Sequence, residues 1–581
     1  MRSGSLFARV ALGLVVLSLI GCAGAPRRSF PLREPFTRDT DLDPVSVRCA
    51  KRPNDKDKNH VSCAPAPYFS PLAWDAADNT LFRPLAKVFA VDPPREARNV
   101  NAFDEVPDSA WFTNRIGVRK PSLEELVRGA CKPEDILDPD SATPGEYVID
   151  QGKPNGASPG FRVKIGGKKK YMFKTDFIKE PERPSAAAVI GTALYHAVGF
   201  NTSCEQVVYV DPKVFELKPG LVVTANDGVT RPFDQRALDK VISEAGKRGE
   251  KRRFQASAWL GGYLLGPFKY EGTRSDDPND VIPHEDRRDL RGGRLLAAWL
   301  HHFDAREQNS MDSWMAVDKA NPESSPGWVK HYYLDTSDCL GSLWEWDGIS
   351  RRMGESYLFD FADIGTDFIT FGAIERPWER KKFAPKMEMF GYFHWEEFDP
   401  ERWRNEYPNP AFSRATEHDN AWMARILSRF DRADIAAIVK LGKFTNPEAD
   451  EFLTEVLEQR LRKIASRYLT RLSPIADVRV DADGRLCATD LARRRAVRPE
   501  AEFRYDATVR SDRGVSSVRV DVAPDGGLCV TLPHVAADRA SPAYVTVTLR
   551  NRVAKGPLEV HLYDFGSSAG HKLAGLVRPD S

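Results

Sequence analysis

The spacing of apolar residues predicts a small strand-rich unit in the first half of the chain. Between residues 146 and 177 the runs EYVID, FRVKI and KYMFKTDF have the composition of β-strands, and Gly166 lies in the turn between the last two. A helix is predicted next, because Ser185 can cap it, apolar residues recur on one face, and Gly199 can end it. The run VVYV at 207–210 returns to strand character, so this unit combines a sheet with one helix.

Helical periodicity dominates the segments that follow. A helix is predicted from about Glu285 to His302, and further helices from about 412 to 472. Between them, the run HYYLD at 331–335 predicts a strand. The basic run KRGEKRR at 247–253 is predicted to be the solvated face of a helix.

The two ends of the chain differ from this middle. Residues 22–140 are rich in Pro, Asn, Asp and Arg, and apart from a predicted helix near 122–129 they indicate an irregular extension. Residues 473–581 contain alternating runs, such as YVTVTL and LEVHL, separated by turn sequences, which predicts an all-β, sandwich-like domain. The whole is therefore expected to be an α+β protein with a core at about 141–472.

The first residues have the layout of an export signal. Arg2 and Arg9 make the N-terminus positive, and residues 10–20 (VALGLVVLSLI) are continuously apolar but too few to span a bilayer as a helix. No other run is apolar enough to cross a membrane, which predicts an exported soluble body.

The sequence Leu19-Ile20-Gly21-Cys22 resembles the lipobox of bacterial lipoproteins. The resemblance implies that residues 1–21 are removed and that Cys22 carries a covalent lipid, palmitate included, which attaches the chain to a membrane of the cell envelope. Ala23 follows the cysteine where lipoproteins retained at the inner membrane often carry Asp, which favours the outer membrane. The alternative is an ordinary signal peptide with an incidental cysteine.

Export also places the remaining cysteines where disulfides form. Cys49 and Cys63 flank a polar, loop-like stretch, and Cys487 and Cys529 lie in the same β-rich region, so both pairs are predicted to be disulfides. Three other cysteines remain, and an odd number leaves at least one free thiol. They are Cys131, Cys204 and Cys339.

The overall charge indicates no polyanionic partner. The 84 Lys and Arg residues nearly balance the 83 Asp and Glu residues, giving a net charge of +1, so a nucleic-acid partner is not expected.

Four polar residues stand at the ends of predicted elements in a fixed order. Lys174 lies on the third strand, Asp304 and Asn309 follow the long helix with D-x-x-x-x-N spacing, and Asp335 ends the strand HYYLD. A fixed ammonium suits phosphate oxygens, amide and carboxylate oxygens suit Mg²⁺, and an aspartate can orient an attacking hydroxyl. Taken singly, each residue also fits a solvated charge, a helix end or a turn.

This order resembles that of protein-kinase-like phosphotransferases, and the small lobe is similar to the atypical HipA-type and CotH kinases. The resemblance implies a bilobal kinase-like core, with a small lobe at about 141–268 and a helical lobe at about 269–472. It implies ATP and Mg²⁺ as cofactors, with Lys174 on the nucleotide phosphates, Asp304 as the catalytic residue, and Asn309 and Asp335 on the metal.

Two further segments occupy positions that the resemblance assigns. Gly152, Gly156 and Gly160 lie between the first two strands, where a phosphate-covering loop belongs, although turns between strands favour glycine anyway. The apolar segment 256–268 lies where a hinge and an adenine pocket belong.

The sequence also departs from the kinase pattern. Residues 186–198 contain no acidic residue to pair with Lys174, so Glu180 or Glu182 is expected to substitute, and Asp335 is followed by Thr and Ser rather than Phe and Gly. Two hypotheses follow: a lipid-anchored phosphotransferase, which would need nucleotide or another donor outside the cytoplasm, and a degenerate kinase-like scaffold that binds an envelope protein or glycan.

Overall fold

The computed structural model describes residues 29–580 except 53–56, 88–94, 154–157, 178, 225–228, 345 and 537–538. In this part the chain has a mixed α+β architecture with several separate sheets. The export signal 1–21 and Cys22 lie outside the described residues. Among the helices that the structure describes, none combines the length and the apolar character needed to cross a membrane.

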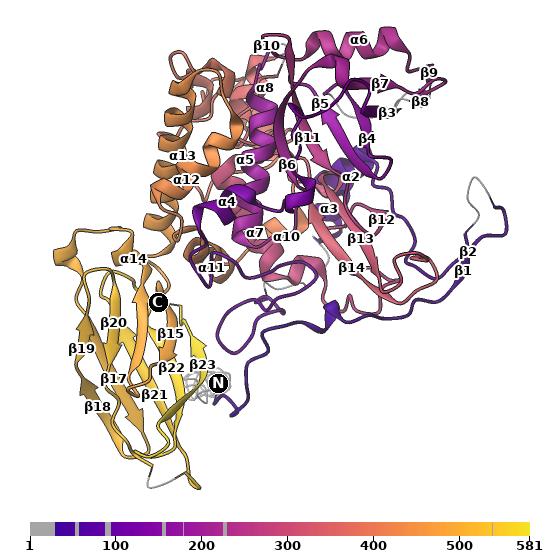
Figure 1. The fold of residues 1–581 in the computed structure, drawn as a ribbon. Helices are drawn as coiled ribbons and strands as arrows, with labels where there is room; N and C mark the ends of the chain where they lie inside the picture. The colour runs from indigo at the N-terminus through magenta and orange to yellow at the C-terminus, as the bar shows by residue number, and fades with distance from the viewer. Residues whose placement is uncertain are drawn as a thin grey trace, which may run out of the picture.

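A seven-stranded sheet forms the upper part of the molecule in Figure 1. Its order is β10-β11-β5-β4-β3-β7, and β6 also pairs with β11. Most pairs are antiparallel, and only β3 with β7 is parallel. The strands are β3 (Tyr147–Gly152), β4 (Gly160–Ile165), β5 (Lys169–Lys174), β6 (Glu205–Val210), β7 (Phe215–Leu217), β10 (Lys247–Arg248) and β11 (Lys251–Ala258). Aromatic residues on alternate positions fill its core, including Tyr147, Phe161, Phe173 and Phe254.

The helix α5 (Arg183–Val198) packs between this sheet and the helical body. It begins two residues before Ser185, whose hydroxyl bonds to Asp176 instead of capping the helix. Nearly every residue of α5 is buried, so both of its faces contact protein. Gly199 ends it with a φ of 147°, as predicted, where a Cβ would lie 2.2 Å from Phe112 Cζ.

The helical body surrounds α7 (Arg288–Leu300). This helix contacts α10, α11 and α13, and the buried Trp299 and Trp422 lie in their shared core. The remaining helices of this body are α8 (Asp347–Arg352), α9 (Phe361–Thr370), α10 (Pro410–Ser413), α11 (Glu417–Leu427), α12 (Arg432–Val439) and α13 (Pro447–Tyr468). One small sheet accompanies them: β12 (Tyr263–Gly266) with β13 (Ser310–Ala316) and β14 (Gly327–Tyr333). Helix α6 (Gln235–Glu244) lies instead on the seven-stranded sheet, where Leu238 and Val241 join its core. The small sheet of β8 (Val222–Thr224) and β9 (Thr230–Pro232) contacts β3.

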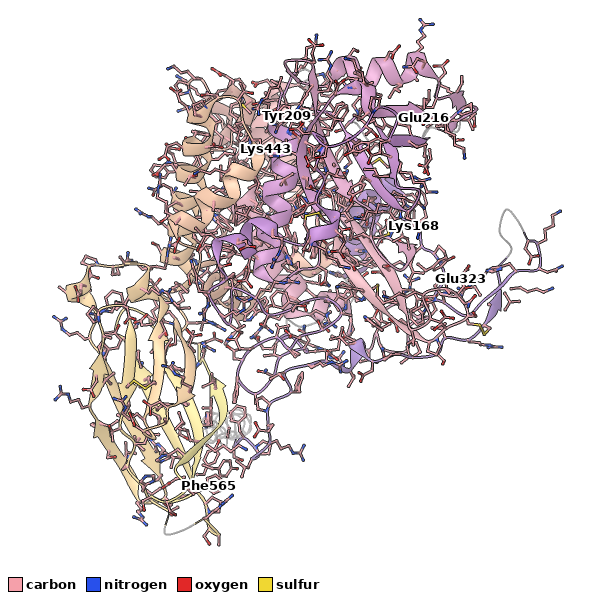
Figure 2. All side chains as sticks on the ribbon, in the orientation of Figure 1. Lys168, Tyr209, Glu216, Glu323, Lys443 and Phe565 are labelled. Atoms are coloured by element: carbon pink, nitrogen blue, oxygen red, sulfur yellow. A yellow bond between two sulfur atoms is a disulfide. The ribbon has the colours of Figure 1, made fainter. Side chains whose placement is uncertain are left out.

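The prediction of a helix face at 247–253 is wrong, because this run forms the β10–β11 hairpin. Gly249, with a φ of 61°, allows the tight turn. Arg253 is buried, and its Nε lies 3.2 Å from Asp176 Oδ2. Its Nη1 donates to the Tyr209 hydroxyl and to the Lys443 carbonyl, and these two residues lie side by side in Figure 2. Arg253 therefore joins the sheet to the helical body, whereas residues 247–250 of the run are exposed.

The C-terminal region consists of two antiparallel sheets around a separate hydrophobic core (Figure 1). The four-stranded sheet has the order β15-β16-β20-β19, and the five-stranded sheet has the order β18-β17-β21-β22-β23. The elements are β15 (Ile475–Val480), β16 (Leu486–Asp490), α14 (Leu491–Arg494), β17 (Asp506–Ser511), β18 (Gly514–Val518), β19 (Val520–Val522), β20 (Gly527–Val530), β21 (Ala543–Arg550), β22 (Leu558–Asp564) and β23 (His571–Val577). Inward-facing Val, Leu and Ile residues fill the space between the sheets.

The N-terminal extension runs past these sheets and along the body (Figure 1). It contains short elements only: β1 (Ala50–Lys51), β2 (Val61–Ser62), α2 (Leu72–Ala77), α3 (Arg83–Lys87) and α4 (Leu123–Arg128). Asp104 bonds to Arg288 of α7 and to Arg578 near the C-terminus. The extension is therefore packed against both of the other parts.

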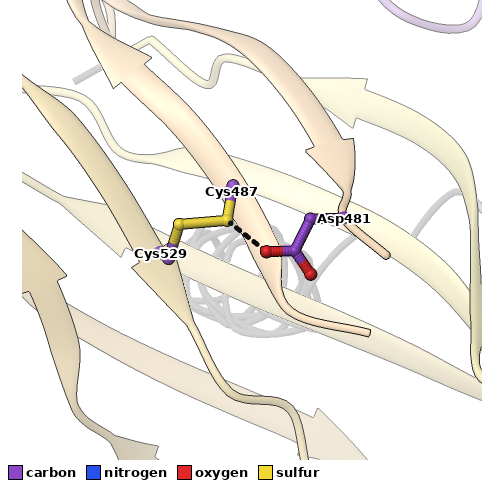
Figure 3. Close-up of side chains that lie close together, drawn as sticks. All are labelled: Asp481, Cys487 and Cys529. Atoms are coloured by element: carbon purple, nitrogen blue, oxygen red, sulfur yellow. Dashed lines mark hydrogen bonds between the residues drawn. A yellow bond between two sulfur atoms is a disulfide. The ribbon is translucent and has the colours of Figure 1, made fainter. Parts of the chain in front are cut away.

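The structure forms both predicted disulfides, Cys49–Cys63 and Cys487–Cys529, the second of which is drawn in Figure 3 beside Asp481. It adds a third, Cys131–Cys204, which links the extension to the start of β6 across 73 residues. Cys339 is a buried free thiol.

Replacing Cys131 and Cys204 together by Ser is expected to lower the free energy of unfolding by about 2–4 kcal/mol, because the unfolded chain loses a cross-link that closes a long loop. Denaturant unfolding under oxidising conditions measures the difference. In excess reductant the difference should vanish, since the natural chain then lacks the cross-link too. Equal stability under oxidising conditions would contradict the third disulfide.

Candidate functional site

Polar side chains from three segments meet between the seven-stranded sheet and the helical body. Lys174, at the end of β5, places its Nζ 3.1 Å from Oδ2 of Asp335, which follows β14. The two residues are 161 positions apart in the sequence. Lys174 is 13% exposed and Asp335 41%, so the ion pair lies at the opening of the site. Asp304 and Asn309, from the loop after α7, complete the cluster.

Strand pairing fixes the position of the lysine. Tyr171 and Phe173 point into the core of the sheet, and successive side chains of a strand alternate, so Lys174 lies on the other face. Its backbone pairs in register with Gly160 of β4 and Gln255 of β11. The ammonium is therefore carried by an interior strand of the sheet and not by a loop.

Asp304 is held by its own loop. Asn309 Nδ2 donates to the Asp304 carbonyl at 2.8 Å and to Oδ2 at 2.6 Å. His302 Nε2 lies 3.2 Å from Asp304 Oδ1. Burial raises the pKa of Asp304, but the neighbouring His302 ring and the Arg306 guanidinium outweigh it and hold the pKa well below its ordinary value. Asp304 is therefore a buried carboxylate.

The segment after β14 carries two aspartates whose pKa values are shifted in opposite directions. Burial raises the pKa of Asp335, but the Lys174 charge and the Ser337 hydroxyl, 2.6 Å from Oδ1, keep that pKa below its ordinary value. Asp338 differs, because burial and the adjacent Asp304 carboxylate raise its pKa well above the ordinary value. These two effects favour the protonated form of Asp338, whose hydrogen bond to Asp304 places the proton between the two carboxyl groups.

Helix α5 holds this segment in place. Arg183 Nη1 donates to the carbonyls of Ser337 at 2.8 Å and Cys339 at 3.2 Å. Thr336 Oγ1 donates to the Ala188 carbonyl at 2.9 Å. Gly191 leaves room for this contact, since a Cβ there would lie 2.8 Å from the Thr336 side chain. The backbone of 336–339 is thereby fixed against the helix.

The expectation that Glu180 or Glu182 pairs with Lys174 is wrong. Glu180 Oε2 accepts a hydrogen bond from Arg183 Nε at 2.8 Å, and Glu182 accepts one from the Thr445 backbone at 2.8 Å. Both carboxylates are turned toward other partners, and Asp335 takes the place beside the lysine.

Packing accounts for two of the three predicted phosphate-loop glycines. A Cβ on Gly160 would lie 2.3 Å from the Phe173 carbonyl oxygen, and one on Gly152 would lie 2.4 Å from Val223 Cγ2. Gly156 lies outside the described residues. Because neighbouring atoms approach so closely, both described positions require glycine, whether or not a ligand binds beside them.

Sequence reasoning missed two residues of this cluster. Lys153 directly follows Gly152, and its Nζ donates to the Ser158 carbonyl at 2.7 Å. Burial, and then the Lys174 charge, lower its pKa to about 8. Asp338 was missed as well, although it stands only three residues after Asp335. The signal for Lys153 was its place inside the glycine-containing loop.

The oxygen atoms of the site suit a hard divalent cation. Asp304 Oδ1 is buried and makes no hydrogen bond of normal geometry within the described residues. The Asp335 carboxylate is partly open to solvent, and the raised pKa of Asp338 reflects the negative charge of the adjacent Asp304 as well as burial. Mg²⁺ takes such carboxylate and amide oxygens together with phosphate and water. The residues present therefore fit a magnesium ion.

Comparison with known proteins gives little beyond this geometry. No protein-family model matches the chain, and no curated protein matches it in sequence. Among solved structures, a proinflammatory kinase of Helicobacter pylori, CtkA, aligns with 56% of this chain and 96% of its own, at 12% identity and a TM-score of 0.28.

Asp338→Asn is expected to raise the melting temperature at pH 7–8. The folded-state pKa of Asp338 is raised, so this residue lowers stability progressively as the pH rises above its unfolded value of about 4. Asparagine can still donate to Asp304 but does not titrate, so the gain should shrink near pH 4. Melting curves at both pH values measure it.

Asp335→Asn is the matched control and should behave in the opposite way. The folded-state pKa of Asp335 is depressed, so its ionised side chain adds to the free energy of unfolding at pH 7. This contribution is lost as the pH falls through that pKa. A loss of stability at pH 7 in Asp338→Asn would contradict the shared proton.

Proposed function

We propose that this chain is a phosphotransferase with a bilobal protein-kinase-like core, which uses ATP and Mg²⁺ to phosphorylate a hydroxyl group. The observation that supports it is the meeting of Lys174 and Asp335 at 3.1 Å, beside the hydrogen-bonded pair Asp304–Asn309. A sheet lysine, a D-x-x-x-x-N loop and a later aspartate are the parts that phosphoryl transfer requires in one place.

Each residue has a role that its position supports. Lys174, with Lys153 beside it, binds the phosphate oxygens, and the loop between Gly152 and Gly160 covers them. Asn309 and Asp335 hold Mg²⁺, which when bound neutralises charge on the phosphates. Asp304, whose ionised form the neighbouring His302 and Arg306 favour in spite of burial, accepts a hydrogen bond from the attacking hydroxyl and orients it.

One observation favours a second function, a degenerate kinase-like scaffold that binds an envelope protein or glycan. No acidic residue of α5 is available to Lys174, and Asp335 pairs with the lysine instead of standing free for a metal. On this alternative the ion pair is structural, and nucleotide does not bind.

Binding of Mg-ATP separates the two functions. If the site is a nucleotide site, Mg-ATP should raise the melting temperature of the natural chain, and Lys174→Met or Asp335→Asn should abolish the rise. Lys168→Met is the matched control, because Lys168 lies in the turn before the same strand and is exposed (Figure 2).

The scaffold is supported if no nucleotide, with or without Mg²⁺, changes the melting temperature of the natural chain. If binding is observed, mass spectrometry of envelope fractions incubated with ATP should detect phosphorylated products that the Asp304→Asn variant does not produce.

We also propose that Cys22 carries a lipid that attaches the chain to the outer membrane, with the body facing the periplasm or the surface. The lipobox-like sequence 19–22 supports it. Cys22→Ser should move the protein from the membrane fraction to the soluble envelope fraction and remove the acyl mass. Cys339→Ser, which changes a buried free thiol, should leave fractionation unchanged. Retention of Cys22→Ser in the membrane would contradict the anchor.

A further inference from the structure

The C-terminal sheets contain a second polar cluster, at their end near Phe565, labelled in Figure 2. Asp564 ends β22, His571 begins β23, and His534 lies in the connection between β20 and β21. His534 Nδ1 is 2.8 Å from Asp564 Oδ1, and His571 Nε2 is 3.7 Å from the same oxygen. The three candidate ligand atoms lie within 4.8 Å of one another.

The His571 ring is buried, and its side chain is 1% exposed. Within the described residues neither ring nitrogen makes a hydrogen bond of normal geometry. Burial lowers the pKa of the ring, and the Pro533 carbonyl, a backbone acceptor beside it, acts to raise that pKa. A buried polar group without a partner is costly and rare in folded proteins. A ligand on one nitrogen, with the carbonyl near the other, is the usual arrangement of a metal-binding histidine.

Backbone hydrogen bonds fix the carboxylate of Asp564. Oδ2 accepts from the backbone nitrogens of Val535 at 2.5 Å and Ala536 at 2.9 Å, and Oδ1 accepts from that of Gly566 at 2.9 Å. These bonds hold Oδ1 toward both imidazole rings, which stack with centroids 4.7 Å apart. The donor atoms are therefore positioned before any ligand binds.

We propose that His534, Asp564 and His571 bind a zinc ion. Two imidazole nitrogens and one carboxylate oxygen are a three-ligand zinc set, which leaves a fourth position for water or an incoming group. Mg²⁺ and Ca²⁺ prefer oxygen ligands, so the two histidines disfavour them. The His534 side chain is 36% exposed, which gives the ion a path from solvent.

The other clusters found among the described residues lack these features. In the cluster of Asp481, Cys487 and Cys529, both sulfur atoms belong to a disulfide (Figure 3). In the cluster of His394, Glu396 and Glu397, one histidine faces two carboxylates that are about half exposed, at 57% and 47%. Exposed groups of this kind are satisfied by water.

Calorimetric titration of the EDTA-treated full chain with Zn²⁺ tests the proposal. We expect one zinc ion per chain, an affinity at least about tenfold lower in His534→Ala, and a similar loss in His571→Gln. Co²⁺ in the same site should give the visible absorption of a low-coordinate nitrogen and oxygen set. His394→Ala and Asp335→Asn should leave zinc affinity unchanged, which separates this site from the surface cluster and from the candidate phosphotransfer site.

Three results would overturn the proposal: no stoichiometric zinc binding by the folded natural chain, full affinity in His534→Ala, or loss of binding in Asp335→Asn alone. His571 is buried, so circular dichroism must confirm that His571→Gln folds. His534 is at the surface, so the zinc affinity of His534→Ala tests the proposal even if His571→Gln does not fold.

Discussion

The buried guanidinium of Arg183 is the contact on which the geometry of the candidate site depends. It lies in the first turn of α5 with no exposed surface, pairs with Glu180, and donates to the carbonyls of Ser337 and Cys339. A buried ion pair is tolerated only when its remaining donors are satisfied, and removing one partner costs about 3–5 kcal/mol. Helix α5 and the segment that carries Asp335 are thus held as one unit.

The same contact explains the pairing of Lys174. Glu180 bonds to Arg183 and α5 itself contains no acidic residue, so Asp335 pairs with the lysine directly. On the proposed function, a metal ion on Asp335 would compete with Lys174 for one carboxylate, and the released ammonium would need phosphate as a new partner. Metal and nucleotide are then expected to bind together, since either alone leaves one charge of the site without a partner.

The sequence predicted elements better than it predicted contacts. The strand patterns predicted that Lys174 lies on a strand and that Asp335 lies at the end of the run HYYLD. Because these residues are 161 positions apart, only the resemblance to kinases suggested that they meet. The Cys131–Cys204 pair was left open because nothing local links cysteines 73 positions apart. The run 247–253 was misassigned because its charges suggested solvent, whereas Arg253 is buried on backbone carbonyls that belong to distant elements.

The N-terminal extension restricts how a lipid on Cys22 would orient the molecule. Phe30 donates its N–H to the Tyr544 hydroxyl at 2.9 Å, and its carbonyl accepts from the Tyr563 hydroxyl at 2.8 Å, so it is held on the C-terminal sheets. The chain from Cys22 to Phe30 can span at most about 28 Å. An anchored chain would therefore keep these sheets close to the membrane. The sheet that carries Lys174 lies at the other end of the molecule (Figure 1), which favours a substrate that extends away from the membrane surface.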